Sequence, residues 1–336
     1  ILYVNLLNSF IETKNNNYLR SKLKQTINFI NSEFISENKF LGSAYDADSE
    51  GVEGKYYVWK YEELKHLLNN ELELFEKKYL ITREGNFEGS NILIEKKDIN
   101  FSETEEKKLI EIETKVLNER KKRIKPFFDD KVQTDLNCYW LYSNLFSSLV
   151  LNNDELLKNT INKIKSLNDK FKDKIFHCYD NQKNEVDVFL DDYVYYSLLL
   201  ITMYEINNDK NSLNRCIQLM DKTWQLFFNK DNDLLQKNKL EINDLFVNPV
   251  DMIDNNIPNA NSIYLLICNK LSNITNQKSW KDKIEVLSKS FHAYINLNFS
   301  QMFSYLKILD ICENNITLTF HGKTDEIDAV KKEIIK

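Results

Sequence analysis

The chain has 336 residues, a net charge of −6 and 42% hydrophobic residues, so it can form two ordinary domains or one large domain with a sizeable core. Only six Gly and three Pro leave few tight turns, which argues against a sandwich or barrel of short strands. The net negative charge argues against a nucleic acid partner, because the single short basic run, at 120–125, cannot follow a phosphate backbone.

Targeting and redox signals are sparse. No apolar stretch is long enough to span a bilayer, so we expect no membrane partner. The chain opens on Ile1 with a helical pattern instead of a Met and a charged leader, so we expect a fragment of a longer protein. Five scattered Cys without a Cys-x-x-Cys motif are typical of reduced core thiols in a cytoplasmic protein, and we predict no cofactor or metal.

Apolar residues recur at helical spacing along most of the chain. This periodicity predicts helices over 2–11, 19–34, 61–68, 71–79, 103–124, 136–151, 155–171, 187–207, 213–228, 260–274, 280–297 and 300–312. The first two form a hairpin, and from residue 135 onward consecutive helices form pairs at the spacing of helical-hairpin repeats. We therefore predict a mainly α fold, a closed or curved array of antiparallel hairpins whose loops gather at its two ends.

The hairpin array is expected to cover 1–315 and to carry two special loops, at 40–59 and 85–94. A strand at 316–320 and a helix at 325–335 would form a C-terminal appendage, 316–336. No sharp linker divides the chain, so one array is favoured over two domains.

The loop at 40–59 concentrates glycine and carboxylates. Three of the six glycines lie here, followed by a strand-like run at 55–59, and four acidic residues surround them: Asp46, Asp48, Glu50 and Glu53. An EF-hand would need a Glu at its twelfth position, where Tyr57 stands, so we reject an EF-hand. A looser cation site remains open, but a turn whose carboxylates cap backbone N–H groups is favoured.

Asp191 and Asp192 open a helix that is otherwise apolar. One aspartate at a helix start is explained by capping and by the helix dipole. A second one could bind hydroxyl groups or act as an acid or base at the mouth of the array. We weigh cap and site evenly for Asp192 and favour the cap for Asp191.

Other polar clusters precede core helices. Asp130, Lys131 and Asn137 are consistent with a cap and a surface ion pair, and Asn261 with a helix entry. The four His lie in unrelated surroundings without ligand spacing, so each is expected to be an ordinary residue. The fingerprints of phosphate-binding loops, dinucleotide sites and serine hydrolases are absent from the sequence.

Several segments together resemble a known family. Residues 43–59, Ser-Ala-Tyr-Asp-Ala-Asp-Ser-Glu-Gly-Val-Glu-Gly-Lys-Tyr-Tyr-Val-Trp, resemble the Ser-Ala-x-Asp-Ala-Asp-Ser-x-Gly-x-Glu-Gly-x-x-Tyr-x-Trp signature of the YyaL / spermatogenesis-associated protein 20 family of thioredoxin-domain-containing proteins. Weaker family motifs follow in order at 85–91, 120–131 and 189–193. Two family segments read differently here: Trp-Asn-Gly is Leu-Asn-Cys at 136–138, and Pro-Ser-Gly-Asn-Ser is Pro-Asn-Ala-Asn-Ser at 258–262.

The resemblance implies an (α/α)6 toroid similar to six-hairpin glycosidases and sugar epimerases, incomplete at its N-terminus. It also implies a thioredoxin-like domain upstream of Ile1, which would be this domain's partner. The family provides no assigned reaction.

Two functions follow. The favoured one is a binding or scaffold module that serves the thioredoxin-like domain. The alternative is a carbohydrate-active enzyme with carboxylates at the toroid mouth, which would need two carboxylates on opposite sides of the bond. Its catalytic candidates are Asp191, Asp192, Asp46 and Asp48, and its ligand-binding candidates are Glu53, Trp59, Asn86, Glu88, Asn91, Asp130, Lys131, Asn137, Tyr193 and Asn261.

Overall fold

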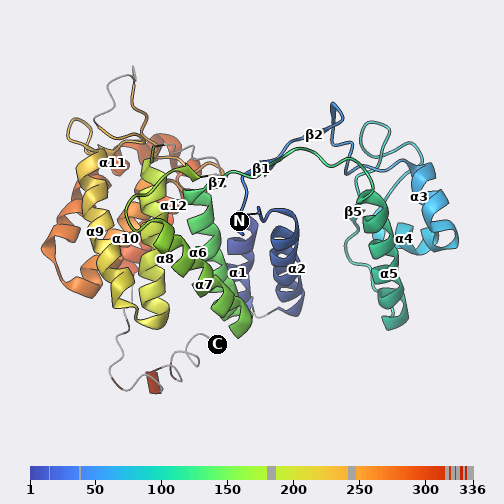
Figure 1. The fold of residues 1–336 in the computed structure, drawn as a ribbon, viewed down its shortest axis with the longest axis horizontal. Helices are drawn as coiled ribbons and strands as arrows, with labels where there is room; N and C mark the ends of the chain where they lie inside the picture. Colours follow the sequence, from blue (N-terminus) through green and yellow to red (C-terminus); the bar gives the residue numbers. More distant parts are fainter. Residues whose placement is uncertain are drawn as a thin grey trace. The chain divides into compact units, whose positions relative to one another are not determined.

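A computed structural model describes the chain except for residues 15, 38, 180–186, 241–246, 315–317, 319–321, 323–325, 328–329 and 331–336. The chain divides into two compact units (Figure 1). Residues 1–43 and 130–336 form the hairpin unit, and residues 44–129 form the inserted unit.

The described part of the hairpin unit consists of long helices joined by loops and two very short β ladders. Its helices are α1 (Leu2–Lys14), α2 (Asn17–Glu33), α6 (Thr134–Val150), α7 (Asp154–Lys170), α8 (Leu190–Asn207), α9 (Lys210–Phe227), α10 (Ala260–Thr275), α11 (Lys278–Asn298), η2 (Phe299–Gln301) and α12 (Phe303–Asn314). Its strands are β7 (Val132–Gln133), β8 (Cys178–Tyr179), β9 (Phe228–Asn229) and β10 (Leu234–Leu235).

These helices form two layers. In the described part of the chain, α1, α6, α8, α10 and α12 pack side by side in that order as an inner layer. Each of the first four has its hairpin partner, α2, α7, α9 or α11, on the outside. The outer helices are amphipathic: the buried positions of α7, Thr160, Ile164 and Leu167, lie on one face. This arrangement confirms the predicted mainly helical α/α toroid class and the three predicted helix pairs after residue 135.

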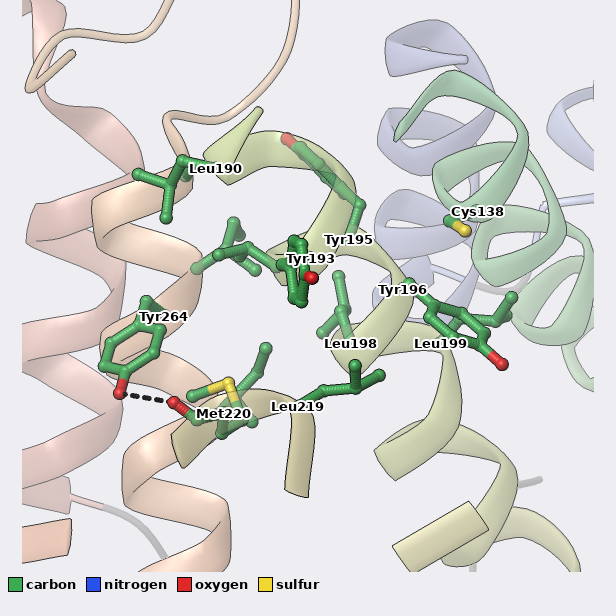
Figure 2. Close-up of a cluster of buried hydrophobic side chains, with 14 of the residues drawn as sticks. Cys138, Leu190, Tyr193, Tyr195, Tyr196, Leu198, Leu199, Leu219, Met220 and Tyr264 are labelled. Atoms are coloured by element: carbon green, nitrogen blue, oxygen red, sulfur yellow. Dashed lines mark hydrogen bonds between the residues drawn. The ribbon is translucent and has the colours of Figure 1, made fainter. Parts of the chain in front are cut away.

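Helix α8 is the centre of the core. Its residues from Asp192 to Met203 are all buried, so it has no polar face and must be surrounded by other helices. Figure 2 shows side chains of α8, α9 and α10 gathered in this core, where the Tyr264 hydroxyl donates to the Met220 carbonyl oxygen at 3.1 Å. All five Cys are free thiols, and only Cys312 is not buried, as the sequence predicts.

The inserted unit has its own small core. Its elements are β1 (Ala44–Tyr45), β2 (Asp48–Ser49), β3 (Val52–Glu53), α3 (Tyr61–Leu68), η1 (Asn69–Glu71), α4 (Leu72–Lys78), β4 (Tyr79–Leu80), β5 (Ile94–Glu95), α5 (Glu103–Arg120) and β6 (Phe128–Asp129). Trp59 and Phe75 pack with apolar residues of α3 and α5. The two predicted special loops, 40–59 and 85–94, thus lie from Ala44 onward within one compact unit.

The acidic loop folds into a tight hairpin. Ser49 pairs with Val52, and the two residues between them, Glu50 and Gly51, both have positive φ, as a type I′ turn requires. The predicted strand at 55–59 is wrong. The backbone forms a turn over 54–57, and of residues 55–59 only Trp59 pairs with another segment, in a β-bridge with Asn91. The backbone N–H of Tyr57 donates to the Gly54 carbonyl at 2.8 Å, which coils the run instead of extending it.

Asparagine side chains take the place of strand pairing at several loops. The amides of Asn86, Asn91, Asn137, Asn248 and Asn261 each accept from a backbone N–H and donate to the carbonyl of that same residue. An amide can do both at once, as a backbone pair does in a sheet. These clamps fix the loops because buried backbone groups need partners.

The C-terminal prediction is largely untested. The predicted strand at 316–320 and helix at 325–335 fall mostly outside the described residues. Among the described helices, none is both long enough and apolar enough to cross a bilayer.

Gly85→Ala should unfold the inserted unit locally. Gly85 has φ +86°, and an added Cβ would lie 2.5 Å from the carbonyl carbon of Gly89 and 2.6 Å from the Ser90 oxygen. We expect a loss of about 3 kcal/mol, from strain plus overpacking, measured by hydrogen exchange of amides in 44–129. Gly51→Ala is the control, since it shares the positive φ but has open space, and should cost about 1 kcal/mol. Equal losses would contradict the steric argument.

Asn137→Asp should destabilise the hairpin unit. The Asn137 amide donates to the carbonyls of Leu41 and Gln133, both at 2.9 Å, and a carboxylate would face those oxygens without a proton. We expect a loss of about 3 kcal/mol in urea unfolding. Asn168→Asp is the matched control, because Asn168 only accepts, from the Tyr196 hydroxyl at 2.8 Å, and should cost about 0.5 kcal/mol.

Candidate functional site

A cavity of about 380 Å³ lies within the hairpin unit where α6 and α8 begin. It combines carboxylates, two basic side chains and apolar walls, as small-molecule sites do. Its lining residues are Gln133, Asp135, Leu136, His177, Phe189, Asp191, Lys237, Asp251, Ile253, Asn255, Asn256, Ile257, Pro258 and Asn259.

Local structure brings the polar groups to this cavity. Asp135 is the second residue of α6, and Asp191 is the second residue of α8. The β7–β8 ladder places His177 beside the start of α6, where the Thr134 N–H donates to the His177 carbonyl at 2.8 Å. The carboxylates thus gather at two helix N-termini, where the dipoles favour negative charge.

Asp192 is fully buried behind this cavity and forms an ion pair with His177. The His177 Nδ1 lies 3.0 and 3.1 Å from its two carboxylate oxygens, and the Phe189 backbone N–H donates to it at 2.8 Å. Burial lowers the pKa of His177, but the hydrogen bond and charge of Asp192 outweigh burial and raise it overall. Asp192 therefore both accepts the backbone N–H of Phe189 at the start of α8 and favours the protonated form of His177.

Asp135 and Asp191, unlike Asp192, have no ion-pair partner among the described side chains, and both have raised pKa values. Burial, followed by the charge of Asp192, raises the pKa of Asp135 from 3.8 to about 6. Burial, followed by the charge of Asp135, raises the pKa of Asp191 from 3.8 to about 6 as well. Each carboxylate accepts only backbone N–H groups at the start of its own helix, and no described side chain donates to either. Both can therefore exchange protons near neutral pH.

A loop covers the other side of the cavity. The Lys237 Nζ lies 3.1 Å from the Asp251 carboxylate, and the Leu190 N–H at the start of α8 donates to the Lys237 carbonyl at 2.9 Å. Burial lowers the pKa of Lys237, but the hydrogen bond of Asp251 and the nearby aspartates raise it overall. Lys237 therefore stays charged at the cavity wall.

One group of residues has the composition of a metal site. Oxygen or nitrogen atoms of Asp135, His177 and Asp192 all lie within 4.8 Å of one another. The His177 Nδ1 already faces both Asp192 oxygens, so a cation would have to replace that hydrogen bond. The predicted absence of a metal stays a prediction.

Of the sequence candidates in the hairpin unit, only the aspartate pair lies at the cavity. Asp191 lines it and Asp192 lies behind it. Asn137 and Asn261 are fully engaged as clamps, and the Tyr193 ring is buried against Phe227. Asp130 and Lys131 are exposed before β7.

The remaining candidates belong to the inserted unit. Exposed acidic candidates are Asp46, Asp48, Glu53 and Glu88, of which Glu53 and Glu88 line a groove of about 660 Å³. Trp59 is 2% exposed, with the Arg123 guanidinium 4.0 Å from its ring centroid, which favours a core role over sugar stacking. Asn86 and Asn91 are clamps. A shared site of these residues with Asp191 and Asp192 stays a prediction.

Sequence reasoning missed four ionisable residues of the cavity: Asp135, His177, Lys237 and Asp251. Asp135 had a usable signal, because it opens an apolar helix as Asp191 does. His177 had none, since its partner lies fifteen residues away across segments whose pairing only the fold decides.

The chain matches no protein-family profile. Human spermatogenesis-associated protein 20 is 25% identical over 296 residues, covering 74% of this chain and 38% of that protein. The chain therefore spans 38% of the length of this relative.

Several solved structures are similar at low identity. They include a glycoside hydrolase family 76 α-mannanase of Bacteroides thetaiotaomicron (14% identity, TM-score 0.46, 91% of this chain and 81% of that one). A family 76 mannosidase of Bacteroides thetaiotaomicron VPI-5482 has 16% identity and a TM-score of 0.43 over 61% of this chain and 59% of that one. A family 105 glycoside hydrolase of C. acetobutylicum ATCC 824 has 13% identity and a TM-score of 0.40 over 90% of this chain and 78% of that one.

Proposed function

We propose that the hairpin unit binds a small polyhydroxylated ligand, of the carbohydrate class, in the 380 Å³ cavity and acts on it by acid–base chemistry. The observation that carries this proposal is the presence of two carboxyl groups, Asp135 and Asp191, with raised pKa values in one cavity. Perturbed carboxyl groups that converge on a concave site are typical of active sites.

The two carboxyl groups suit proton transfer because each has a pKa of about 6. A general acid or base works best when its pKa lies near the working pH. Because the charge of Asp135 raises the pKa of Asp191, loss of the proton of Asp135 opposes loss of the proton of Asp191. One group would then donate a proton to the ligand while the other, ionised, accepts one.

The rest of the cavity suits a hydroxylated ring. Leu136, Phe189 and Ile253 provide apolar wall, and the carboxylates and Lys237 provide hydrogen-bond acceptors and donors. Asp192 acts as a positioning residue: by holding the Phe189 N–H and His177, it fixes the first turn of α8 that carries Asp191.

A second candidate is binding without turnover, as in a binding or scaffold module. The observation that favours it is the complete engagement of Asp192, whose oxygens are taken by His177 and Phe189 and are 0% exposed. This leaves only Asp135 and Asp191 to act on a ligand. A thioredoxin-like domain as partner, implied by the family resemblance, remains a prediction, as does a cytoplasmic location.

A panel of mono- and disaccharides should identify the ligand class. A ligand that binds only the folded chain stabilises it by about 2.7 kcal/mol at a hundred times its Kd, which raises the melting temperature. We expect such a shift for at least one sugar with the full chain, and its loss in Asp135→Asn and Asp191→Asn. The control is Asp221→Asn, which removes a carboxylate paired with Lys283 on the outer helix α9 and should keep the shift.

Turnover separates the two candidates. Product formation from a sugar that binds, reduced about 100-fold or more in either cavity variant, would support acid–base catalysis. Binding with no product would support the binding module instead. If no sugar shifts the melting temperature of the unmodified chain, the carbohydrate proposal is wrong.

Asp191→Asn should stabilise the chain at neutral pH but not in acid. Because the pKa of Asp191 is about 6 in the folded chain against an ordinary 3.8, the folded chain holds this proton to a higher pH, so stability falls as pH rises from about 4 to about 6. The amide removes that cost, and we expect a gain of about 1–2 kcal/mol at pH 7.5 that vanishes near pH 4. Urea unfolding at both pH values measures this, and an equal gain at both would contradict the assigned pKa.

A further inference from the structure

The charges around the cavity do not balance. Carboxylates come from α6 and α8 and from Asp251, while the cations are His177 and Lys237. Both cations are already used: His177 pairs with Asp192 at 3.0 Å, and Lys237 pairs with Asp251 at 3.1 Å. In the described part of the chain, neither Asp135 nor Asp191 forms a direct ion pair; the charges of His177 and Lys237 act on them only from a longer distance.

This imbalance has a physical cost. Buried carboxylates are normally paired, because removing a charge from water without a partner is expensive. Burial, followed by the charge of Asp192 for Asp135 and by the charge of Asp135 for Asp191, raises the pKa of both carboxyl groups, so they hold their protons to a higher pH than usual. The two lie at helix N-termini, which ease the cost but provide no mobile counter-charge. A cation that enters the cavity would reduce the free-energy cost of these carboxylates.

We infer that the cavity takes a cationic polyhydroxylated ligand, an amino sugar or similar amino polyol, whose ammonium group lies between Asp135 and Asp191. This rests on the proposed function and narrows its substrate class. An ammonium group carries three N–H donors and no acceptor, which matches two carboxylates that accept only from backbone. Charge-assisted hydrogen bonds of this kind are about twice as strong as neutral ones.

The same charges reject other sugars. A phosphate or carboxylate on the ligand would face Asp135, Asp191 and Asp251, with Lys237 already paired to Asp251. Like charges placed together at a binding site cost affinity and so provide specificity. A neutral sugar would enter only with a proton retained on one of the two free carboxylates.

A divalent metal ion is a less favourable source of positive charge. Asp135, His177 and Asp192 lie close enough to hold one, but the ion would break the His177–Asp192 hydrogen bond. It would also leave Asp191 without a direct partner, because Asp191 is not one of the three. The ammonium ligand compensates both free carboxylates and leaves the existing ion pair intact.

The test is calorimetric titration of the full chain with matched pairs of sugars. Glucosamine, galactosamine and mannosamine are compared with their N-acetyl forms, which keep the ring but lose the charge, and with glucosamine 6-phosphate. At neutral pH we expect at least one amino sugar to bind about tenfold tighter than its N-acetyl form, with the phosphate weaker than both.

Variants locate the effect. In Asp191→Asn or Asp135→Asn, the amino sugar should bind about as tightly as its N-acetyl form, since each variant removes one of the two carboxylates. Asp221→Asn on α9 removes an equal charge outside the cavity and should leave the preference unchanged. Far-ultraviolet circular dichroism confirms that each variant is folded, and two cavity variants keep the test valid if one of them fails to fold.

The outcomes separate this inference from the function it rests on. If neutral sugars bind as tightly as amines, the inference fails while the carbohydrate site stands. If no sugar of either kind binds, the proposed function fails with it. If Zn²⁺ or Mg²⁺ alone raises the melting temperature and blocks the amino sugar, and Asp192→Asn abolishes this, the cavity takes a metal ion and the inference is overturned.

Discussion

The burial of α8 from Asp192 to Met203 is the constraint on which the hairpin unit depends. A helix that is apolar on every side can be stable only when other helices cover it, and α6, α9 and α10 do so. That requirement sets the two layers and aligns the starts of α6 and α8 at one end. Asp191, in the first turn of α8, is not fully buried in the apolar core and lines the cavity.

Buried carboxylates make that end expensive. The hydrogen bonds of Asp192 with His177 and with the Phe189 N–H offset part of this cost, although burial still raises the pKa of Asp192 overall. Asp135 and Asp191 have no such partner among the described side chains. Their raised pKa values reflect the folding stability that is lost when these carboxyl groups ionise. Functional sites often hold strain or charge of this kind, because a ligand that relieves it gains binding energy.

Asparagine amides hold the loops around this core. The chain has little β structure, with ladders only two residues long, so its loops cannot be fixed by sheets. Clamps such as Asn137 on Leu41 and Asn261 on Leu235 satisfy the backbone groups that a strand would otherwise pair. The same residues looked like ligand-binding candidates in the sequence, because an amide that binds a sugar and one that binds a backbone have identical chemistry.

The sequence by itself determined the helices and their pairing after residue 135, and it pointed to Asp191 and Asp192 as candidates, because these depend on periodicity and on polar residues within one segment. It misjudged the run at 55–59, where the turn at Gly54 overrides strand-like residues. Only the tertiary structure decided that 44–129 forms its own unit, that Trp59 belongs to its core, and that His177, Lys237 and Asp251 join Asp135 at one cavity. Those contacts join residues far apart in the chain, and no local pattern encodes which loops will meet.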